Sequence, residues 1–175
     1  LHLNKYHFIA IGGSAMHSLA IALKNNGHQI SGSDDAIFDP ALSQLQKAKI
    51  CPEQMGWFPE KILPQLDAVI LGMHAKKDNP ELLAAQKMGL SVYSYPEFIA
   101  QYAQNKTRVV IAGSHGKTTI SAMVLHVLNY HQKPVDYMIG AQLEGFENSV
   151  FLSEDNEFIV LEGDEYLSSP IDSRP

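Results

Sequence analysis

Seven consecutive residues have the types and spacing that bind a polyphosphate. Between a predicted strand and a predicted helix, the chain carries Gly113, Ser114, His115, Gly116, Lys117, Thr118 and Thr119. Glycines let backbone N–H groups approach phosphate oxygens, the helix N-terminus attracts negative charge, and the Lys117 ammonium group provides a point charge. The Thr118 hydroxyl would bind Mg²⁺. Because Ile111 stands where the general pattern has its first glycine, we predict a shortened ATP-binding loop; a glycine turn that only caps a helix is the alternative.

A group of carboxylates follows another predicted strand. Residues 158–161 (FIVL) form an apolar run of the kind found in buried strands, and Glu162, Asp164 and Glu165 come next. The carboxyl ends of parallel strands form the edge at which α/β proteins bind ligands. A hard cation that bridges phosphates takes oxygen ligands, so we predict that Glu162 binds Mg²⁺ across from Thr118. Asp164 and Glu165 could take this role instead, and a solvated acidic turn is the non-functional interpretation.

A second glycine turn follows the apolar residues 6–11 near the start of the chain. It matches the dinucleotide-binding pattern only in part, because Ala10 and Ala15 replace two of its glycines. Ser33 and the carboxylates of Asp34 and Asp35 stand about 20 residues later, at the end of the next predicted strand, where such folds hold a nucleoside. A nucleotide diphosphate could therefore lie over Gly12, Gly13 and Ser14. The alternative is a helix-capping turn followed by an ordinary aspartate turn.

Two histidines stand at the same predicted edges. His74 follows the third predicted strand, and His115 lies within the ATP-binding loop. Histidine can donate, accept or carry a proton near neutral pH, so both side chains are candidates for ligand contact. A purely structural role is the alternative for each of them.

The elements that would position these residues alternate between strand and helix. Short apolar runs predict strands at 6–11, 28–32, 67–73, 91–95, 109–112 and 158–161. Apolar residues at helical spacing, or a proline at a helix start, predict helices at 16–26, 40–49, 79–87, 96–104 and 118–130. The alternation predicts an α/β fold with a parallel sheet and right-handed crossovers.

The polar stretch 104–107 predicts a domain boundary, because the cycle of strand, glycine turn and helix starts again after it. We place the two domains at residues 1–105 and 106–175. The second has only about 70 residues, which is small for a doubly wound domain. We therefore expect a truncated domain.

The composition excludes several classes of protein. A net charge of −6 and a pI of about 5.7 provide no basic surface for nucleic acid or anionic lipid. The single cysteine, Cys51, cannot form an internal disulfide, which argues against a disulfide-stabilised secreted protein. No apolar run is long enough to cross a bilayer, and no signal peptide is recognisable. We expect a cytoplasmic protein.

The motifs together resemble those of the Mur ligases. The loop GSHGKTT, the segment VLEGDE, the early IGGSAM with the later SGSD, and DNPEL at 78–82 occur in the order found in that family. The resemblance covers the whole chain. It is greatest to the members that act on UDP-N-acetylmuramate, namely the L-alanine ligase and the ligase that recycles a tripeptide. Tyr166, which follows the acids, favours the tripeptide branch.

The resemblance implies a function for each domain. Residues 1–105 would form a Rossmann-like domain that binds the UDP-sugar, and residues 106–175 the start of a P-loop ATPase-like α/β domain that binds ATP. Lys117 and Thr118 would hold the ATP phosphates and Mg²⁺, and Glu162 would be a second ligand of Mg²⁺. Along the UDP would lie Gly12, Gly13, Ser33 and Asp34, and near the sugar His74 and Asn79.

The reaction implied by the resemblance is the ATP-dependent formation of an amide bond in peptidoglycan synthesis or recycling. The γ-phosphoryl group of ATP would pass to the lactyl carboxylate of UDP-N-acetylmuramate, with Lys117 and Mg²⁺ stabilising the developing charge. The amine of L-alanine or of a murein peptide would then displace phosphate. Residues 1–175 alone would be inactive. The alternatives are a UDP-sugar-binding regulatory module without catalysis and an NAD-dependent oxidoreductase.

Overall fold

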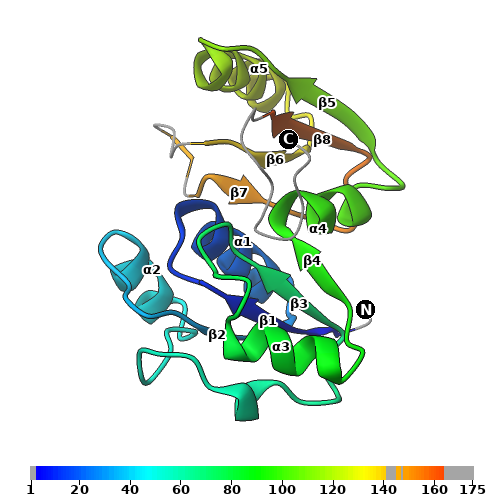
Figure 1. The fold of residues 1–175 in the computed structure, drawn as a ribbon. Coiled ribbons are helices and arrows are strands. Elements are labelled where there is room, and N and C mark those ends of the chain that lie inside the picture. The colour runs from blue at the N-terminus through cyan, green and yellow to red at the C-terminus, as the bar shows by residue number, and fades with distance from the viewer. Residues whose placement is uncertain (1–2, 141–144, 147, 164–175) are drawn as a thin grey trace. The chain divides into compact units, whose positions relative to one another are not determined.

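The computed structural model describes residues 3–140, 145–146 and 148–163. Contacts within the chain divide it into two compact units, with the boundary between Ile99 and Ala100 (Figure 1). Each unit combines a sheet with helices, so the predicted α/β class is confirmed. The assignment of a UDP-sugar domain to 1–105 and of the start of an ATP-binding domain to 106–175 stays a prediction. Within the described residues, no helix is both long enough and apolar enough to cross a bilayer.

The first unit is built on a parallel sheet of strand order β2-β1-β3-β4. Its strands are β1 (Lys5–Ile9), β2 (Gln29–Ser33), β3 (Ala68–Leu71) and β4 (Val92–Ser94). Its helices are α1 (Ser14–Asn25), α2 (Ala41–Lys47), the 3₁₀ helix η1 (Pro59–Lys61), α3 (Pro80–Lys87) and the first part of α4 (Tyr95–Tyr102), whose residues from Ala100 onward belong to the second unit. The predicted strands and helices of this region are present with bounds shifted by a few residues, and η1 was not predicted.

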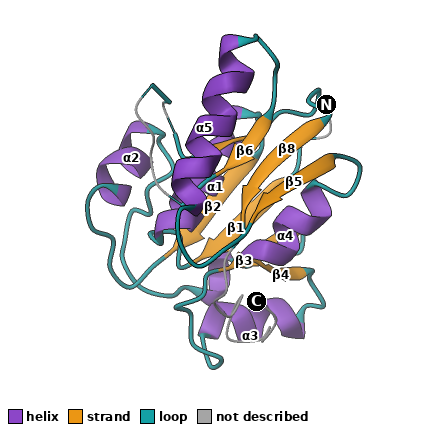
Figure 2. Cartoon of the chain, turned by 90° about the horizontal axis from the view of Figure 1, so that it is seen from above, coloured by secondary structure: helices purple, strands orange, loops and turns teal. Residues whose placement is uncertain are grey.

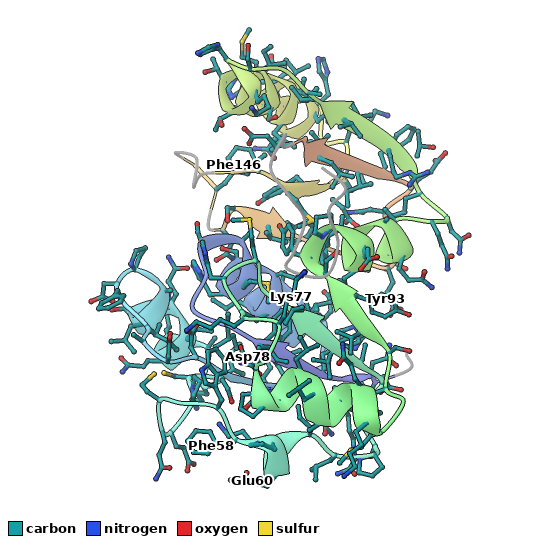
Figure 3. All side chains as sticks on the ribbon, in the orientation of Figure 1. Phe58, Glu60, Lys77, Asp78, Tyr93 and Phe146 are labelled. Carbon is teal, nitrogen blue, oxygen red and sulfur yellow. The ribbon has the colours of Figure 1, made fainter. Side chains whose placement is uncertain are left out.

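The central strands are buried because helices cover both faces of the sheet. Helices α1 and α3 lie on opposite sides of it (Figure 1). All residues of β3 are buried, as an unbroken apolar run predicts for a parallel strand. The segment with Phe58 and Glu60 runs alongside α3 (Figure 3). The core on the α3 side includes Ile9, Ile62, Val69, Leu71 and Leu82. This packing fixes the carboxyl ends of β1, β2 and β3.

The second unit has a sheet of strand order β5-β8-β6-β7. Its strands are β5 (Thr107–Ile111), β6 (Asp136–Met138), β7 (Val150–Phe151) and β8 (Phe158–Glu162). Strands β5, β8 and β6 are parallel, whereas β7 pairs with β6 in the antiparallel direction. Helix α5 (Lys117–Tyr130) packs against β8 and β5 (Figure 2). Strands β6 and β7 were not predicted, because each is too short to show a strand-like apolar pattern.

Candidate functional site

The loop between β5 and α5 has a backbone that depends on glycine. Gly116 is the N-cap of α5 and adopts the left-handed conformation, with φ 77° and ψ 0°. Gly113 also has a positive φ, of 150°. A side chain at either position would be strained, whereas glycine is not. Gly116 itself provides no capping side chain, and a helix N-terminus attracts anions through its N–H groups.

The side chains of Lys117 and Thr118 reach back from the first turn of α5. Lys117 Nζ donates a hydrogen bond of 2.6 Å to the carbonyl oxygen of Gly113. The Thr118 hydroxyl donates a hydrogen bond of 2.6 Å to Glu162 Oε1. The two meet because β5 and β8 are neighbours, with Ile111 opposite Glu162 in the register. The structure therefore brings the predicted ATP-binding loop and the predicted carboxylate ligand together.

Both carboxylate oxygens of Glu162 have partners in the second unit. While Oε1 accepts from Thr118, Oε2 accepts a hydrogen bond of 2.6 Å from the N–H of Gly140, just after β6. A Cβ at position 140 would lie 3.3 Å from Oε2, which is a tight contact. Sequence reasoning missed Gly140, since the contact spans 22 residues. Gly140 stands two residues after β6, a strand that the sequence did not predict, so no pattern in the sequence pointed to it.

The oxygens of Thr118 and Glu162 form a donor set that fits Mg²⁺. This ion prefers oxygen ligands and is usually held by one or two protein groups together with substrate phosphates and water. The described ranges contain no cluster of three or more His, Cys, Asp or Glu side chains that could hold a metal. Phosphate oxygens would therefore have to complete the coordination. His115 is exposed in the loop, and Asp164 and Glu165 lie outside the described residues.

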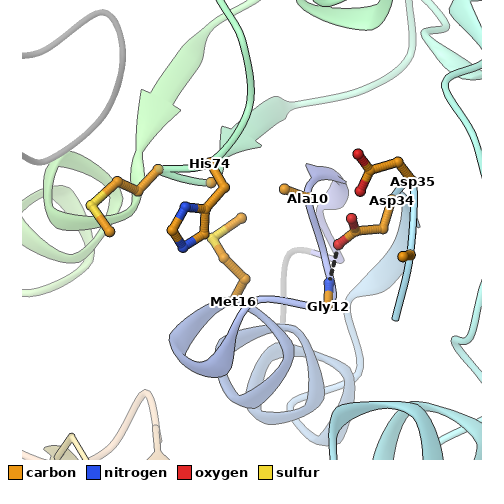
Figure 4. Close-up of a pocket in the computed structure, with 10 residues that line it drawn as sticks. Ala10, Gly12, Met16, Asp34, Asp35 and His74 are labelled. Carbon is orange, nitrogen blue, oxygen red and sulfur yellow. Dashed lines mark hydrogen bonds between the residues drawn. The ribbon is translucent and has the colours of Figure 1, made fainter. Parts of the chain in front are cut away.

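A pocket of about 240 Å³ opens at the carboxyl end of the first sheet. Figure 4 shows His74 and Met16 on one side of it and Asp34 and Asp35 on the other, with the Gly12 turn between them. The loops after β1, β2 and β3 meet here, as expected for the ligand edge of a parallel sheet. The pocket brings together four of the predicted substrate residues, Gly12, Gly13, Asp34 and His74.

The carboxylate of Asp34 holds the glycine turn in place. Its Oδ2 accepts a hydrogen bond of 2.7 Å from the Gly12 N–H. Burial raises the pKa of Asp34 above its ordinary value against the effect of this hydrogen bond, and Asp35 adds to the rise. A Cβ on Gly12 would lie 2.9 Å from both Asp34 Oδ2 and a side-chain carbon of Ile37. A Cβ on Gly13 would meet nothing closer than 3.4 Å. Of these two positions, only position 12 therefore lacks the space for a side chain.

Three predicted substrate residues lie outside the pocket lining. Ser33 is fully buried, and its hydroxyl accepts a hydrogen bond of 3.1 Å from Lys61 Nζ. The buried Asn79 side chain caps α3, since its Oδ1 accepts from two backbone N–H groups at 2.9 and 3.2 Å. Ser14 is exposed at the first position of α1. Ser33 and Asn79 thus make structural contacts, and sugar or nucleoside contacts of all three residues stay predictions.

The pocket also contains two side chains that sequence reasoning did not select, Met16 and Met73. Their signals were weak, because both methionines continue apolar patterns. Asp35, which the sequence places beside Asp34, lines the pocket as well. Ala10 has a φ of 64° at the position where the dinucleotide pattern has a glycine. The turn therefore keeps a glycine-like backbone although the residue is alanine.

Sequence comparison relates the chain to one family. Residues 5–107 match the profile of the Mur ligase family, catalytic domain. The chain is 37% identical over 161 residues to the UDP-N-acetylmuramate--L-alanine ligase of Lactiplantibacillus plantarum, a match that covers 92% of this chain and 35% of that protein. The ligase of the same name from Limosilactobacillus reuteri is 38% identical over 165 residues, with 93% and 35% covered.

Structural comparison gives related enzymes. The UDP-N-acetylmuramate:L-alanyl-gamma-D-glutamyl-meso-diaminopimelate ligase of Neisseria meningitides has a TM-score of 0.86 at 28% identity, covering 98% of this chain and 56% of that chain. The UDP-N-acetylmuramate-alanine ligase of Thermotoga maritima has a TM-score of 0.73 at 25% identity, covering 90% and 37%. The chain spans about 35% of the length of the curated relatives it matches. Since the family profile matches more than half of it, the resemblance is confirmed, and the chain belongs to the Mur ligase family.

Proposed function

We propose that this chain is part of an ATP-dependent, Mg²⁺-dependent ligase that acts in the cytoplasm in peptidoglycan synthesis or recycling. It joins the lactyl carboxylate of UDP-N-acetylmuramate to L-alanine or to an L-Ala-D-Glu-diaminopimelate-type peptide. The observation that carries the proposal is the hydrogen bond of 2.6 Å between Thr118 Oγ1 and Glu162 Oε1. It unites a phosphate-binding loop and a carboxylate from separate parts of the sequence, as a site for a nucleotide and its metal requires.

The second unit is proposed to activate the carboxylate. A lactyl carboxylate oxygen attacks the γ-phosphorus of ATP, the bond from that phosphorus to the bridging oxygen breaks, and ADP leaves. Lys117 stabilises the charge that gathers on the transferred group, and the N–H groups at the start of α5 bind the phosphates. Thr118 and Glu162 hold Mg²⁺, which neutralises phosphate charge when bound. The amine nitrogen then attacks the acyl carbon, loses a proton and displaces inorganic phosphate.

The first unit is proposed to hold the UDP-sugar. The diphosphate lies over the Gly12–Gly13 turn at the start of α1, where backbone N–H groups can meet it. Asp34 faces the nucleoside side, and His74 lies across the pocket toward the sugar. An NAD-dependent oxidoreductase would use the same turn, but that function would not explain the phosphate-binding loop at Gly113–Thr119. For this reason we favour the ligase.

Residues 106–175 are proposed to be the first part of a larger central domain. Strand β5 has a neighbour on one side only among the described strands, and Val110 on it is 55% exposed. On α5, Ile120, Met123, Val127 and Tyr130 are exposed at helical spacing. A monomeric domain seldom leaves so many large apolar side chains on neighbouring elements, so further chain of the same domain is expected to cover them.

The identity of the incoming amine is open to a direct test. The sequence matches carry the name of an L-alanine ligase, whereas the structure with a TM-score of 0.86 is a ligase for a tripeptide. Both amines belong to the proposal. Supplying L-alanine and the tripeptide separately to the full-length protein, with UDP-N-acetylmuramate and ATP, and comparing kcat/KM decides between them.

We expect Gly12→Ala to weaken binding of UDP-N-acetylmuramate by about 10- to 100-fold, because overpacking typically costs about 1–3 kcal/mol. The new Cβ would push on the Asp34 carboxylate and on Ile37. Calorimetric titration of the full-length protein measures the effect. Gly89→Ala is the control, because Gly89 lies outside the pocket lining and a Cβ there would meet no atom within 4 Å. Equal affinity of both variants, or tighter binding of NADH than of the UDP-sugar by the wild type, would overturn the assignment of this pocket.

We expect Glu162→Gln to weaken Mn²⁺ binding in the presence of ATP by at least about tenfold, since even an outer partner of a metal ligand typically contributes 10–100-fold. Affinity for the UDP-sugar should stay unchanged. Electron paramagnetic resonance of bound Mn²⁺ measures the loss, and Glu157→Gln, exposed just before β8, serves as the control. If Glu162→Gln kept its Mn²⁺ affinity, Asp164 or Glu165 would become the ligand.

A further inference from the structure

A buried polar network lies on the α3 side of the first sheet. Its centre is Glu81 of α3, whose side chain is fully buried. Glu81 Oε2 lies 3.2 Å from Nε2 of His7, which is also fully buried, and Glu81 Oε1 accepts a hydrogen bond of 2.8 Å from the N–H of Phe58. One side chain thus joins α3 to β1 and to the segment before η1.

A second set of contacts leads from this network to the pocket. Lys61 Nζ donates to the Ser33 hydroxyl at 3.1 Å and lies 3.4 Å from the carbonyl oxygen of Gly32. The Ser33 carbonyl oxygen accepts hydrogen bonds of 2.9 and 3.1 Å from the N–H groups of Ala10 and Ile11. The Lys61 N–H donates a hydrogen bond of 2.9 Å to the carbonyl oxygen of Phe58. Ser33 is therefore linked through Lys61 to the segment that Glu81 anchors, and through its backbone to the loop that forms the pocket.

The residue after Ser33 is the one that holds the glycine turn. Asp34 accepts from the Gly12 N–H through its carboxylate, and its carbonyl oxygen accepts a hydrogen bond of 2.7 Å from the N–H of Gly56. Gly12 follows the two residues whose N–H groups bind the Ser33 carbonyl oxygen, and Gly56 stands two residues before Phe58, whose N–H binds Glu81. A short chain of hydrogen bonds that ends at Glu81 thus sets the position of the Asp34 carboxylate.

We propose that Glu81 is a positioning residue for the UDP-sugar: through the segment 56–61 and Ser33 it fixes Asp34 and the Gly12 turn in the conformation that receives the nucleotide. Glu81 itself does not line the pocket. This inference rests on the proposed function of the pocket. It also reassigns Ser33, which acts as the link between Lys61 and Asp34 instead of contacting the UDP.

The energetics of burial support a role in positioning. A carboxylate removed from water loses its hydration, and buried charged groups often stabilise a fold no better than apolar side chains of the same shape. The neighbours of Glu81 on α3 show the apolar solution, because Leu82 and Ala85 are fully buried in the core cluster. The contacts of Glu81 instead hold α3, β1 and the Phe58 segment in one arrangement.

The test compares Glu81→Gln with Leu82→Ala in the full-length protein. Leu82 is the adjacent residue on α3, is equally buried, and contributes only apolar packing. Thermal unfolding is measured for both variants, and binding of UDP-N-acetylmuramate is titrated at a temperature at which both are folded. We expect Glu81→Gln to weaken binding about tenfold, as for the loss of a hydrogen bond to a charged group. Leu82→Ala should change it less than about twofold although it lowers the unfolding temperature at least as much.

Steady-state kinetics provide a readout that a loss of stability alone would not produce. Glu81→Gln should raise KM for the UDP-sugar and leave KM for ATP unchanged. Ser33→Ala should show the same pattern, and the double variant should be no worse than either single one, because both changes break the same chain of contacts. Lys61→Met, a change at a half-buried position, repeats the test should Glu81→Gln fail to fold.

The outcomes separate the two proposals. If the wild type does not bind UDP-N-acetylmuramate, the proposed function of the pocket fails. If the wild type binds but Glu81→Gln and Lys61→Met bind equally well, the positioning role fails while the pocket stands. A loss in Ser33→Ala alone would make Ser33 a direct ligand and would also overturn the inference.

Discussion

Replacing Lys117 by alanine in the full-length protein should lower the rate of acyl phosphate formation by about 10²- to 10³-fold, the typical cost of losing one preorganised charge or donor at a transition state. The ammonium group lies over the loop, 2.6 Å from the Gly113 carbonyl oxygen, where phosphate oxygens would gather. Release of ADP and formation of the UDP-sugar product are followed together. Affinity for UDP-N-acetylmuramate should not change, because its pocket belongs to the other unit.

The control for this prediction is Lys133→Ala. Lys133 is exposed just after the C-terminal end of α5, so its replacement removes the same charge at the opposite end of that helix. Residues 1–175 alone are measured in the same assay and should form no product, since a ligase must hold three reactants in line. Full activity of Lys117→Ala would show that this loop is not the ATP site. Robust product from residues 1–175 would show that the rest of the protein is dispensable.

Replacing Asp136 by alanine should destabilise the second unit by about 3–5 kcal/mol, the usual result of leaving a buried charge without its partner. Asp136 is fully buried at the start of β6, and its Oδ2 lies 3.1 Å from Lys106 Nζ. It also accepts hydrogen bonds from the Tyr102 hydroxyl, the Ser153 N–H and the Asn156 amide. Burial, with the Asp136 carboxylate next in importance, raises the pKa of Tyr102, which therefore stays a hydrogen-bond donor.

Urea unfolding of the full-length protein measures this loss. Asp155→Ala removes an exposed carboxylate from the loop before β8 and should change the unfolding free energy by less than about 0.5 kcal/mol. Lys106→Met should recover part of the stability when combined with Asp136→Ala, because the unpaired ammonium group is then gone as well. An unfolding free energy of Asp136→Ala close to that of the wild type would show that water replaces the lost contacts.

The sequence was most informative where the chain is almost continuously apolar. The runs that became β3 and β8 are of this kind, and a glycine turn follows β1 and β5 within a few residues. Sequence reasoning failed for β6, whose first residue is the charged Asp136. That carboxylate is tolerated because Lys106 and Tyr102 lie beside it, a relation that only the folded chain creates.

The sequence predicted the types of residue in the candidate site but not the hydrogen bonds between residues that are far apart in the sequence. The spacing of Lys117 and Thr118 within one loop is local, and so is the acid that ends β8. The Gly140 N–H on Glu162, and the path from Glu81 through Ser33 to Asp34, join residues far apart in the sequence. For Asn79, local sequence pattern was the better guide. We predicted a sugar contact for this residue, but its side chain caps α3, as an asparagine directly before a helix-starting proline also indicates.

The hydrogen bond from Gly140 to Glu162 makes one amide proton a spectroscopic reporter. We expect an amide that donates to a carboxylate at 2.6 Å to have a downfield chemical shift. If Glu162 turns toward an arriving cation, this proton loses its acceptor, and the shift changes. Isotopic labelling of glycine alone would therefore make the loading of the ATP site visible by nuclear magnetic resonance, with no probe attached to the nucleotide or to the protein.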